Sequence, residues 1–454
     1  MLFGDKILQY KEEILEDLNT LLSFESVDGE KEGECSKAMD FIIKRARDFG
    51  LEAEQVTDKS CHVQLGSGGK LCGVLSHLDV VPAGNNWTVI PFALTRRDGR
   101  LYGRGVADDK GAALINLYCL RTLKENGVKG ANTLRAIFGT AEETGMTDMD
   151  GYFAKMPLPD MAFTPDSDYG ICCAEKGILH VCISTPLNEA KVLSQFHSGK
   201  AINAVPDLAY AMLDSSGYDE QMLMRLADAS EGDFEFNYTI DGLMIISRGK
   251  ASHACEPQNG KNAAALLIDL ICNAYDVPDV GRLCSFIDYA LNCETNGRSL
   301  GLKMSDAISG ALTVNLGIVH IEDQVAQAQF DIRYPVTVNG DYVLRQFRSV
   351  CEHSGLRCEV LHHEKPLNIE KDSQLIKILC EAYESVTGEP AEIYSTGGGT
   401  YARKLGGRGV AFGPNFKTDC INMHNADESV DENNFFTHAQ ICLEAMYRMF
   451  GCES

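Results

Sequence analysis

Histidine and acidic residues occur in five short segments that could carry chemistry: His77-Leu78-Asp79, Asp108-Asp109, Glu142-Glu143, Thr164-Pro165-Asp166 and the distant Met423-His424. Imidazole and carboxylate groups are ligands for Zn²⁺ and similar divalent cations. A carboxylate beside such a cation can also take a proton from water and deliver it to a leaving amine. These residue types therefore indicate metal-assisted hydrolysis.

The tripeptide from His77 to Asp79 places two polar side chains on one face of a strand end, because side chains alternate along a strand. Asp79 could orient the His77 imidazole, since metal-bound histidines usually donate their second ring N–H to a carboxylate or carbonyl. A histidine at a strand end is more often a plain polar residue. The tripeptide alone does not decide between these interpretations.

The acidic pairs have structural alternatives as well. Asp108 and Asp109 lie in a glycine-rich segment before an expected helix, where aspartate is a favourable capping residue. Capping accounts for one carboxylate and leaves the adjoining like charge unexplained. Glu142-Glu143 could be a solvated acidic turn, and Asp166 could be a turn residue.

Alternating strand and helix patterns would position these segments. Apolar runs predict strands at 71–77, from 133 and from 160, with a helix from 111 between the first two. This alternation favours an α/β fold with a mixed, largely parallel sheet and helices on both faces. The chemically loaded segments follow the carboxyl ends of the strands, where open α/β sheets bind ligands.

The 454 residues exceed what a single core usually holds, so two domains are expected. After residue 177 the strands become shorter, and helices are expected at 262–275 and 340–353. We expect one domain that carries the candidate metal ligands, formed by 1–178 and 368–454, interrupted by a separate α+β domain at 179–367. The length of this insertion is compatible with a monomer.

A formal net charge of −24 disfavours nucleic acid and anionic membrane surfaces as partners. No window approaches about 18 consecutive apolar residues, which argues against a membrane span. The first residues include acids within their apolar stretch, unlike a secretory signal. We therefore expect a cytoplasmic protein whose seventeen cysteines, none spaced Cys-x-x-Cys, are reduced thiols.

In order and context, the five segments resemble the M20 metallopeptidases. Three further segments make the chain most similar to the long PepV-like (Sapep-like) bacterial dipeptidases: Ala174-Glu-Lys-Gly177, Gly249-Lys-Ala-Ser-His253 and Thr396-Gly-Gly-Gly-Thr-Tyr401. The resemblance covers nearly the whole chain. It implies a metallo-dipeptidase acting on small peptides.

The resemblance also implies the metal ligands. One divalent metal, Zn²⁺ or Mn²⁺, would be bound by His77, Asp108 and Asp166, and a second by Asp108, Glu143 and His424, so that Asp108 bridges the two. Asp79 would support His77, and Glu142 would be the general base for a water between the metals. Family members often have a cis bond between the paired acids, which we expect between Asp108 and Asp109.

The resemblance implies that 1–178 and 368–454 form the catalytic domain and that the inserted domain at 179–367 is a lid. In this lid, His253 would donate to the substrate carbonyl oxygen, and Asn203 and Arg333 would contact the substrate. Arg333 could grip a carboxylate with two parallel hydrogen bonds, although without the resemblance it would be interpreted as an exposed strand residue. Gly398 would let the substrate's terminal carboxylate approach backbone N–H groups.

Asp166 favours a substrate with a free amine, because deacylases and carboxypeptidases of the family tend to carry glutamate at this position. The alternative within hydrolases is an amidase of N-acyl amino acids. A binding protein without turnover is the alternative outside enzymes, and the complete ligand set argues against it. Ser167-Asp168 replaces the Ala-Glu typical of PepV-like proteins, which leaves the preferred N-terminal residue open.

Overall fold

The computed structural model describes residues 2–185, 190–215, 217–291, 293–322 and 325–451. The chain forms two compact units: unit 1 is Met1–Ala174, Leu367–Ser395 and Gly399–Ser454, and unit 2 is Glu175–Pro366 and Thr396–Gly398. The units differ from the expected division in three places, because residues 175–178 and 396–398 belong to unit 2 and residue 367 belongs to unit 1. The Lys176 amide donates to the Thr396 carbonyl at 3.0 Å, which ties these two segments together.

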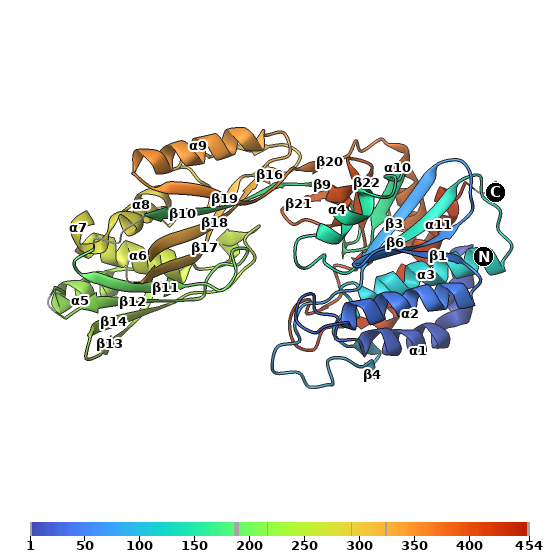
Figure 1. The fold of residues 1–454 in the computed structure, drawn as a ribbon, viewed down its shortest axis with the longest axis horizontal. Helices are drawn as coiled ribbons and strands as arrows, with labels where there is room; N and C mark the ends of the chain where they lie inside the picture. Colours follow the sequence, from blue (N-terminus) through green and yellow to red (C-terminus); the bar gives the residue numbers. More distant parts are fainter. Residues whose placement is uncertain (1, 186–189, 216, 292, 323–324, 452–454) are drawn as a thin grey trace. The chain divides into compact units, whose positions relative to one another are not determined.

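A nine-stranded sheet forms the centre of unit 1, in the order β1-β2-β6-β3-β7-β22-β9-β20, with β21 beside β9 (Figure 1). Its middle strands are parallel: β3 (Leu71–His77) lies between β6 (Thr133–Gly139) and β7 (Met161–Thr164), and β22 (Gly409–Phe412) follows β7. The pairs β1–β2, β2–β6 and β22–β9 are antiparallel. The predicted α/β class with a mixed, largely parallel sheet is confirmed. The remaining strands of this sheet are β1 (Glu52–Thr57), β2 (Ser60–Leu65), β9 (Ile171–Glu175), β20 (Leu367–Asn368) and β21 (Ile393–Thr396).

Helices cover both faces of this sheet. On one face α3 (Lys110–Glu125) packs on β3 and β6, and the helices α1 (Lys11–Leu22), α2 (Glu34–Asp48) and α11 (Glu432–Met449) pack on α3. On the other face α4 (Thr147–Phe153) and the 3-10 helix η3 (Tyr401–Leu405) enclose a small apolar core with Leu75 and Ile137. The helix expected from residue 5 begins as the 3-10 turn η1 (Gly4–Tyr10). The other elements of unit 1 are β4 (Thr95–Arg97), β5 (Arg100–Tyr102), β8 (Ser167–Asp168), α10 (Gln374–Thr387), β23 (Pro414–Asn415) and β24 (Ser429–Asp431).

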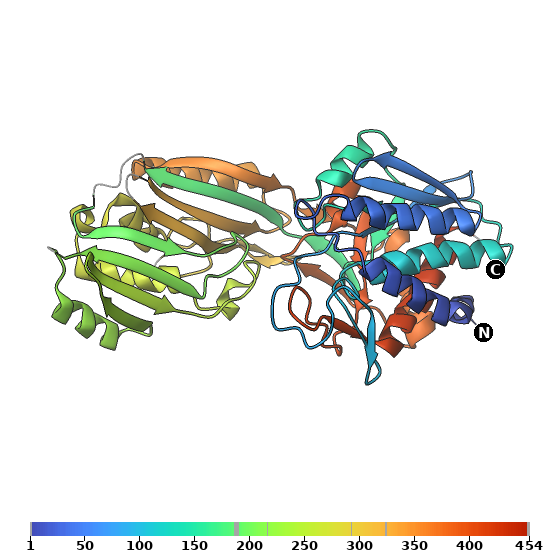
Figure 2. The same cartoon turned by 60° about the horizontal axis from the view of Figure 1, so that its bottom comes forward.

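Unit 2 is built on an eight-stranded antiparallel sheet with the order β13-β14-β12-β11-β17-β18-β10-β19. Helices α5, α6, α8 and α9 pack on one face and enclose one apolar core. The other face is open, and β10 alternates between buried and half-buried residues accordingly. Figure 2 shows strands of this sheet in front of its helices. The strands are β10 (Gly177–Thr185), β11 (Leu193–Ser198), β12 (Leu208–Asp214), β13 (Asp233–Tyr238), β14 (Gly242–Arg248), β17 (Thr313–Glu322), β18 (Val325–Tyr334) and β19 (Arg357–Glu364). The helices and short elements are α5 (Glu220–Ala229), η2 (Pro257–Asn259), α6 (Ala263–Ala274), α7 (Val277–Val280), α8 (Arg282–Leu291), β15 (Ser305–Asp306), β16 (Gly310–Ala311) and α9 (Gly340–His353).

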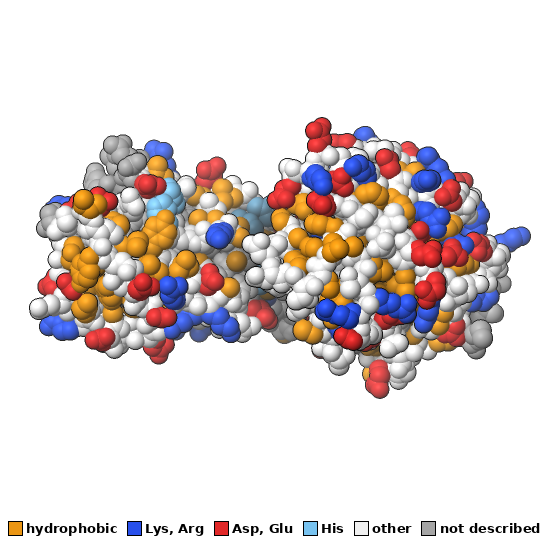
Figure 3. Space-filling view, turned by 90° about the horizontal axis from the view of Figure 1, so that it is seen from below, with side chains coloured by type: hydrophobic (Ala, Val, Ile, Leu, Met, Phe, Trp, Pro, Cys, Tyr) orange, Lys and Arg blue, Asp and Glu red, His pale blue; other side chains and the backbone are white. Residues whose placement is uncertain are grey.

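The surface of each unit mixes charged and apolar side chains on the face shown in Figure 3. Among the described residues, no helix combines the length and apolar character that crossing a membrane requires. The sixteen cysteines within the described ranges are all free thiols.

Candidate metal centre

The loops after three parallel strands of unit 1 bring the predicted residues to one edge of the sheet. His77 is the last residue of β3, Glu142 and Glu143 follow β6, and Asp166 follows β7. Because β6, β3 and β7 are parallel neighbours, their carboxyl ends meet at the same edge. The strand pattern therefore accounts for the meeting of segments that are far apart in the sequence.

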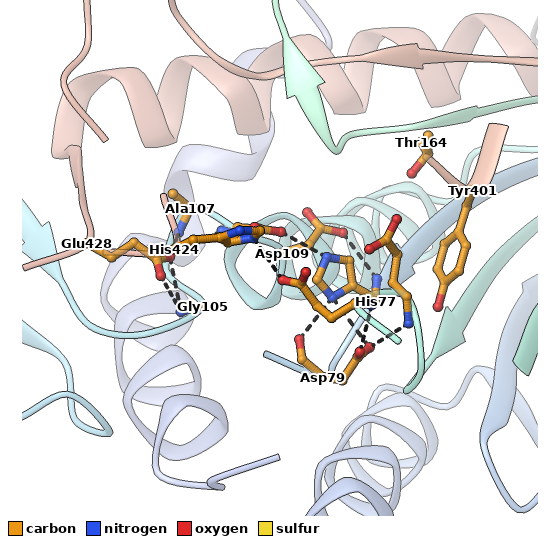
Figure 4. A network of polar contacts seen from close by, with 12 residues as sticks. His77, Asp79, Gly105, Ala107, Asp109, Thr164, Tyr401, His424 and Glu428 are labelled. Atoms are coloured by element: carbon orange, nitrogen blue, oxygen red, sulfur yellow. Dashed lines mark hydrogen bonds and ion pairs between the residues drawn. The ribbon is translucent and has the colours of Figure 1, made fainter. Parts of the chain in front are cut away.

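Asp108 lies at the centre of this cluster. One of its carboxylate oxygens is 2.9 Å from Nε2 of His77, and the other is 2.8 Å from Nε2 of His424. The same nitrogen of His424 is 3.1 Å from a carboxylate oxygen of Glu143. Figure 4 shows the imidazoles of His77 and His424 within this cluster. A single buried carboxylate thus joins two histidines from distant segments.

Potential metal-binding atoms form two overlapping groups. His77, Asp108 and Glu143 offer atoms within 4.8 Å of one another, and so do His77, Glu142 and Asp166. Four of the five predicted metal ligands belong to these groups. The fifth, His424, contacts two of them, Asp108 and Glu143. The expected base, Glu142, lies beside Asp166.

Asp79 contacts His77 mainly through its main chain, whereas we expected its carboxylate to contact the imidazole. Nδ1 of His77 is 2.9 Å from the main-chain carbonyl oxygen of Asp79 and 3.5 Å from its carboxylate. The carboxylate instead accepts the backbone N–H groups of Glu142, at 3.2 Å, and Glu143, at 3.1 Å. Asp79 therefore orients the imidazole through its main chain and holds the Glu142-Glu143 turn through its side chain.

Glu428 is a buried support that the sequence interpretation missed. Its carboxylate accepts the N–H groups of Gly105, Ala107 and Asp108 and pairs with Arg104 at 2.6 Å. Figure 4 shows it beside Gly105. A buried arginine needs a counter-charge, so Arg104 was a signal that an acid must lie nearby. The sequence pattern alone does not identify which acid this is.

Asp148 supports the turn after β6 in the same way. Its carboxylate accepts the Ala141 amide at 2.9 Å and the hydroxyl proton of Tyr401. The Tyr401 ring lies edge-on to His77, with ring centroids 6.3 Å apart. Asp148 was not among the predicted residues, and its partner is remote in sequence.

The backbone at Asp108 and His424 has unusual conformations. The peptide bond between Asp108 and Asp109 is cis, as expected. The Asp109 carboxylate has a different partner from that of Asp108: it accepts the backbone N–H of His77 at 3.2 Å. His424 has a φ of 61°, in the left-handed region that residues with a Cβ rarely adopt. Such residues cluster at functional sites.

The surroundings shift the pKa values of the carboxylates in this cluster in opposite directions. Burial raises the pKa of Glu142 well above its ordinary value, and nearby Asp166 adds to this effect. Burial, followed by the charge of Asp108, also raises the pKa of Glu143. Burial opposes ionisation of Asp108, but His424 and His77 outweigh it and lower the pKa of this carboxyl. Burial likewise disfavours the charged form of His424, yet Asp108 and Glu143 raise its pKa to about 10.

Two of the substrate contacts predicted in unit 2, Asn203 and His253, lie on neighbouring segments that are joined through their backbones. The amide of Ala254, next to His253, donates to the Asn203 carbonyl at 2.9 Å, and Ala204 bridges to His253. Nδ1 of His253 accepts the Cys255 N–H at 3.2 Å and lies 2.9 Å from the Cys255 sulfur. Nδ1 is therefore the acceptor nitrogen, and the ring proton of a neutral His253 belongs on Nε2.

Arg333 is buried, with 4% of its surface exposed, and is not the exposed strand residue that its pattern suggested. It forms two parallel hydrogen bonds with the carboxylate of Asp331, at 2.6 and 2.7 Å. Its Nη1 donates to the Gly397 carbonyl at 3.0 Å, next to the predicted Gly398. The sequence interpretation missed Asp331. This residue accepts hydrogen bonds from Nε and Nη2 of Arg333, the pair of donors that could have bound a substrate carboxylate.

Comparison with known proteins assigns the chain to a family. The model of peptidase family M20/M25/M40 matches residues 73–448, which include every predicted metal ligand. The chain belongs to this family.

Relatives of this M20 chain match it over nearly their full length. It is 32% identical to the Bacillus subtilis (strain 168) protein named "Putative dipeptidase YtjP", over 98% of each chain. It is 30% identical to "Putative dipeptidase SSP1012" of Staphylococcus saprophyticus, over 99% of each. Human carnosine dipeptidase 1 has the same fold, with a TM-score of 0.62 at 13% identity, covering 99% of this chain and 98% of the other.

The cluster of this M20 chain fits divalent metal ions. Asp108, Glu142, Glu143 and Asp166 gather four carboxylates around two imidazoles, an excess of negative charge that cations would neutralise. The nitrogen–oxygen distances of 2.8 and 2.9 Å around Asp108 are those of hydrogen bonds, and bonds of roughly 2.0–2.2 Å to one tetrahedral ion would hold such atoms about 3.3–3.6 Å apart, so each pair would need to separate by less than about 1 Å to admit an ion. The donors thus match a site of nitrogen and oxygen ligands.

Proposed function

We propose that this M20-family chain is a di-metal-dependent dipeptidase that hydrolyses dipeptides with a free N-terminus. The observation that carries the proposal is the contact of both Asp108 oxygens with different imidazoles, those of His77 and His424. This arrangement suits a carboxylate shared by two ions. The full-length similarity to proteins named as dipeptidases supports the choice of substrate class.

In this proposal, His77, Asp108 and Asp166 would hold one divalent ion, and Asp108, Glu143 and His424 would hold the other. Zn²⁺ and Mn²⁺ both suit imidazole and carboxylate ligands. When bound, the two ions would polarise the substrate carbonyl and lower the pKa of a water molecule, which makes water a nucleophile near neutral pH.

Glu142 is the proposed general base. It would take a proton from the attacking water and then deliver it to the nitrogen of the departing amine. Burial and the neighbouring charge of Asp166 raise the pKa of Glu142, which favours holding the proton between the two steps. Asp79 would position Glu142 through the hydrogen bond to its amide.

His253, Asn203, Arg333 and Gly398 are the proposed substrate contacts from unit 2. With Nδ1 of His253 occupied by the Cys255 N–H, Nε2–H would donate to the carbonyl oxygen as negative charge develops there. Arg333 holds the carbonyl of Gly397, so we propose that it shapes the Gly397-Gly398 backbone for the substrate's carboxylate. This role differs from a direct two-pronged grip, because Asp331 already pairs with the guanidinium.

The test is hydrolysis of a dipeptide panel by the wild-type chain and the Glu142→Gln variant with Zn²⁺ or Mn²⁺. We expect wild-type cleavage and a loss of kcat of about 10²–10⁴-fold in the variant, which should bind as many metal ions per chain as the wild type. Glu52→Gln, at an exposed position on β1, is the matched control and should keep full activity. Full activity of Glu142→Gln would contradict the proposed base.

N-terminally acetylated dipeptides and N-acyl amino acids belong in the same panel, because they distinguish the two hydrolase classes. A dipeptidase that uses the free amine should cleave unblocked dipeptides faster. Preference for the blocked compounds would assign the chain as an amidase of N-acyl amino acids instead. Failure to cleave any compound with either metal would reject both activities.

A further inference from the structure

The open face of the unit 2 sheet carries a second group of potential metal ligands, His197, His320 and Glu322. His197 on β11 lies directly opposite His320 on the neighbouring strand β17. Glu322 follows His320 by two residues and therefore shares its face of the strand. Histidine side chains reach the surface on the face of unit 2 seen in Figure 3.

The polar atoms of this group lie close together, and an ion would take one of the two nitrogens of His197. Nδ1 of His197 is 3.0 Å from Nδ1 of His320, and Nε2 of His197 is 3.7 Å from a carboxylate oxygen of Glu322. One potential ligand atom from each residue lies within 4.8 Å of the other two. Two nitrogens bound to one Zn²⁺ at about 2.0 Å each lie roughly 3.3 Å apart in tetrahedral geometry, close to the observed separation.

The surroundings prepare His197 for this role. The ring of Tyr210, from the adjacent strand β12, stacks on it with centroids 5.0 Å apart and planes inclined by 26°, which limits its orientation. Burial, and next the neighbouring His320, lower the pKa of His197 despite the opposing charge of Glu322. The lower pKa favours the uncharged imidazole, which has a lone pair to offer.

We propose that His197, His320 and Glu322 form a binding site for a divalent transition-metal ion, in addition to the proposed ions at Asp108. Two imidazoles and one carboxylate suit Zn²⁺, and the solvent-facing side leaves a fourth position for water. The ion would replace the proton shared by the two imidazoles. Because its ligands come from two strands, it would also cross-link β11 and β17 in the middle of the sheet.

The test is equilibrium dialysis of the full chain against buffered Zn²⁺ at neutral pH, followed by measurement of bound zinc per chain. We expect the wild type to hold one zinc more than His197→Gln and His320→Gln. Glu322→Gln should retain that zinc less tightly. His353→Gln, at an exposed histidine of α9, is the matched control and should bind as much zinc as the wild type.

Equal zinc content in the wild type and in the folded His197→Gln, His320→Gln and Glu322→Gln variants would overturn the proposal. Circular dichroism establishes that each variant is folded. If the histidine variants do not fold, Glu322→Gln decides, because its side chain is largely exposed and its substitution leaves both strands intact. The readout is a difference of one ion, so it holds even if the proposed ions at Asp108 are absent.

Discussion

Asp79 shows how a carboxylate can serve the metal centre without facing a metal ion. Its two oxygens accept the amides of Glu142 and Glu143, so it fixes the turn that presents the proposed base and a proposed ligand. Its main-chain carbonyl meets the His77 ring. One residue thereby constrains three side chains of the cluster.

We predict that Asp79→Ala lowers metal affinity or kcat/KM by about 10–100-fold, the usual effect of removing a group that orients metal ligands. Asp79→Asn should lose less, because its amide oxygen can still accept one N–H. Dipeptide kinetics and metal titrations of the two variants measure this. Wild-type affinity and kinetics in Asp79→Ala would show that the turn holds its position without the carboxylate.

Glu428 has a structural role that can be measured as stability. We predict that Glu428→Gln lowers the free energy of unfolding of unit 1 by about 3–5 kcal/mol, because it leaves Arg104 buried without a counter-charge. Denaturant unfolding measures the loss. The control is Glu25→Gln, which removes an exposed pair with Lys31 and should cost at most about 1 kcal/mol. Similar losses in both variants would contradict the role of burial.

At the scale of elements, the strands were predictable because their apolar runs are distinct. The run from Leu71 to His77 indicated a buried strand, and β3 has these bounds. Such strands place His77, Glu142 and Asp166 at one edge without further information. Residues 5–10 were expected to be part of the α-helix, but apolar periodicity does not separate an α-helix from the 3-10 helix observed at 4–10.

The ion pairs that hold these elements together were not predictable. Arg104 and Glu428 are 324 residues apart in sequence, and a composition with 65 acidic residues offers many equivalent candidates. Arg333 and Asp331 are close in sequence, yet the alternation pattern does not reveal that a short loop from residues 396–398 covers the guanidinium. Pairings of this kind depend on the tertiary arrangement, which local patterns do not encode.

Helix α11 carries a buried histidine that should make stability depend on pH. His438 accepts or donates a hydrogen bond with Tyr169 at 2.8 Å, and burial lowers its pKa to about 3. Its ordinary value is 6.5, so between pH 6.5 and 3 the unfolded chain binds a proton that the folded chain does not. Stability therefore falls as the pH falls through this range.

We predict that His438 alone lowers the free energy of unfolding by about 2 kcal/mol between pH 7 and pH 5. Urea unfolding of the wild type and of His438→Asn at several pH values measures this contribution. Between pH 7 and pH 5 the free energy of unfolding of the variant should fall by about 2 kcal/mol less than that of the wild type, whatever the stability of the variant at pH 7. The same pH dependence in both chains would show that His438 is protonated in the folded state.

At the scale of the whole molecule, the two units have separate means of stabilisation. Unit 2 has one apolar core between its sheet and helices. Unit 1 combines its own packed sheet with a cluster of buried like charges around Asp108. Metal ions at Asp108 would relieve that repulsion, so removal of those ions should act on unit 1 and leave the core of unit 2 unchanged.

The last prediction uses Trp87, the single tryptophan of the sequence, which belongs to unit 1 and lies 5.2 Å from the Arg104 guanidinium. In the His320→Gln variant, which removes the additional ion proposed for unit 2, a chelator should lower the melting temperature reported by Trp87 fluorescence. Ions present at 100 times their Kd stabilise by about 2.7 kcal/mol, so the shift should amount to several degrees.

Circular dichroism follows both units in the same experiment, and we expect it to show a second transition that the chelator leaves in place. Adding Asp108→Asn to the His320→Gln variant supplies the control, because a chain that has lost the shared carboxylate should not respond to the chelator. Equal shifts of the fluorescence and dichroism transitions would mean that the two units unfold together. An unchanged Trp87 transition would mean that the ions contribute no stability to unit 1, since a ligand that binds only the folded state must raise its melting temperature.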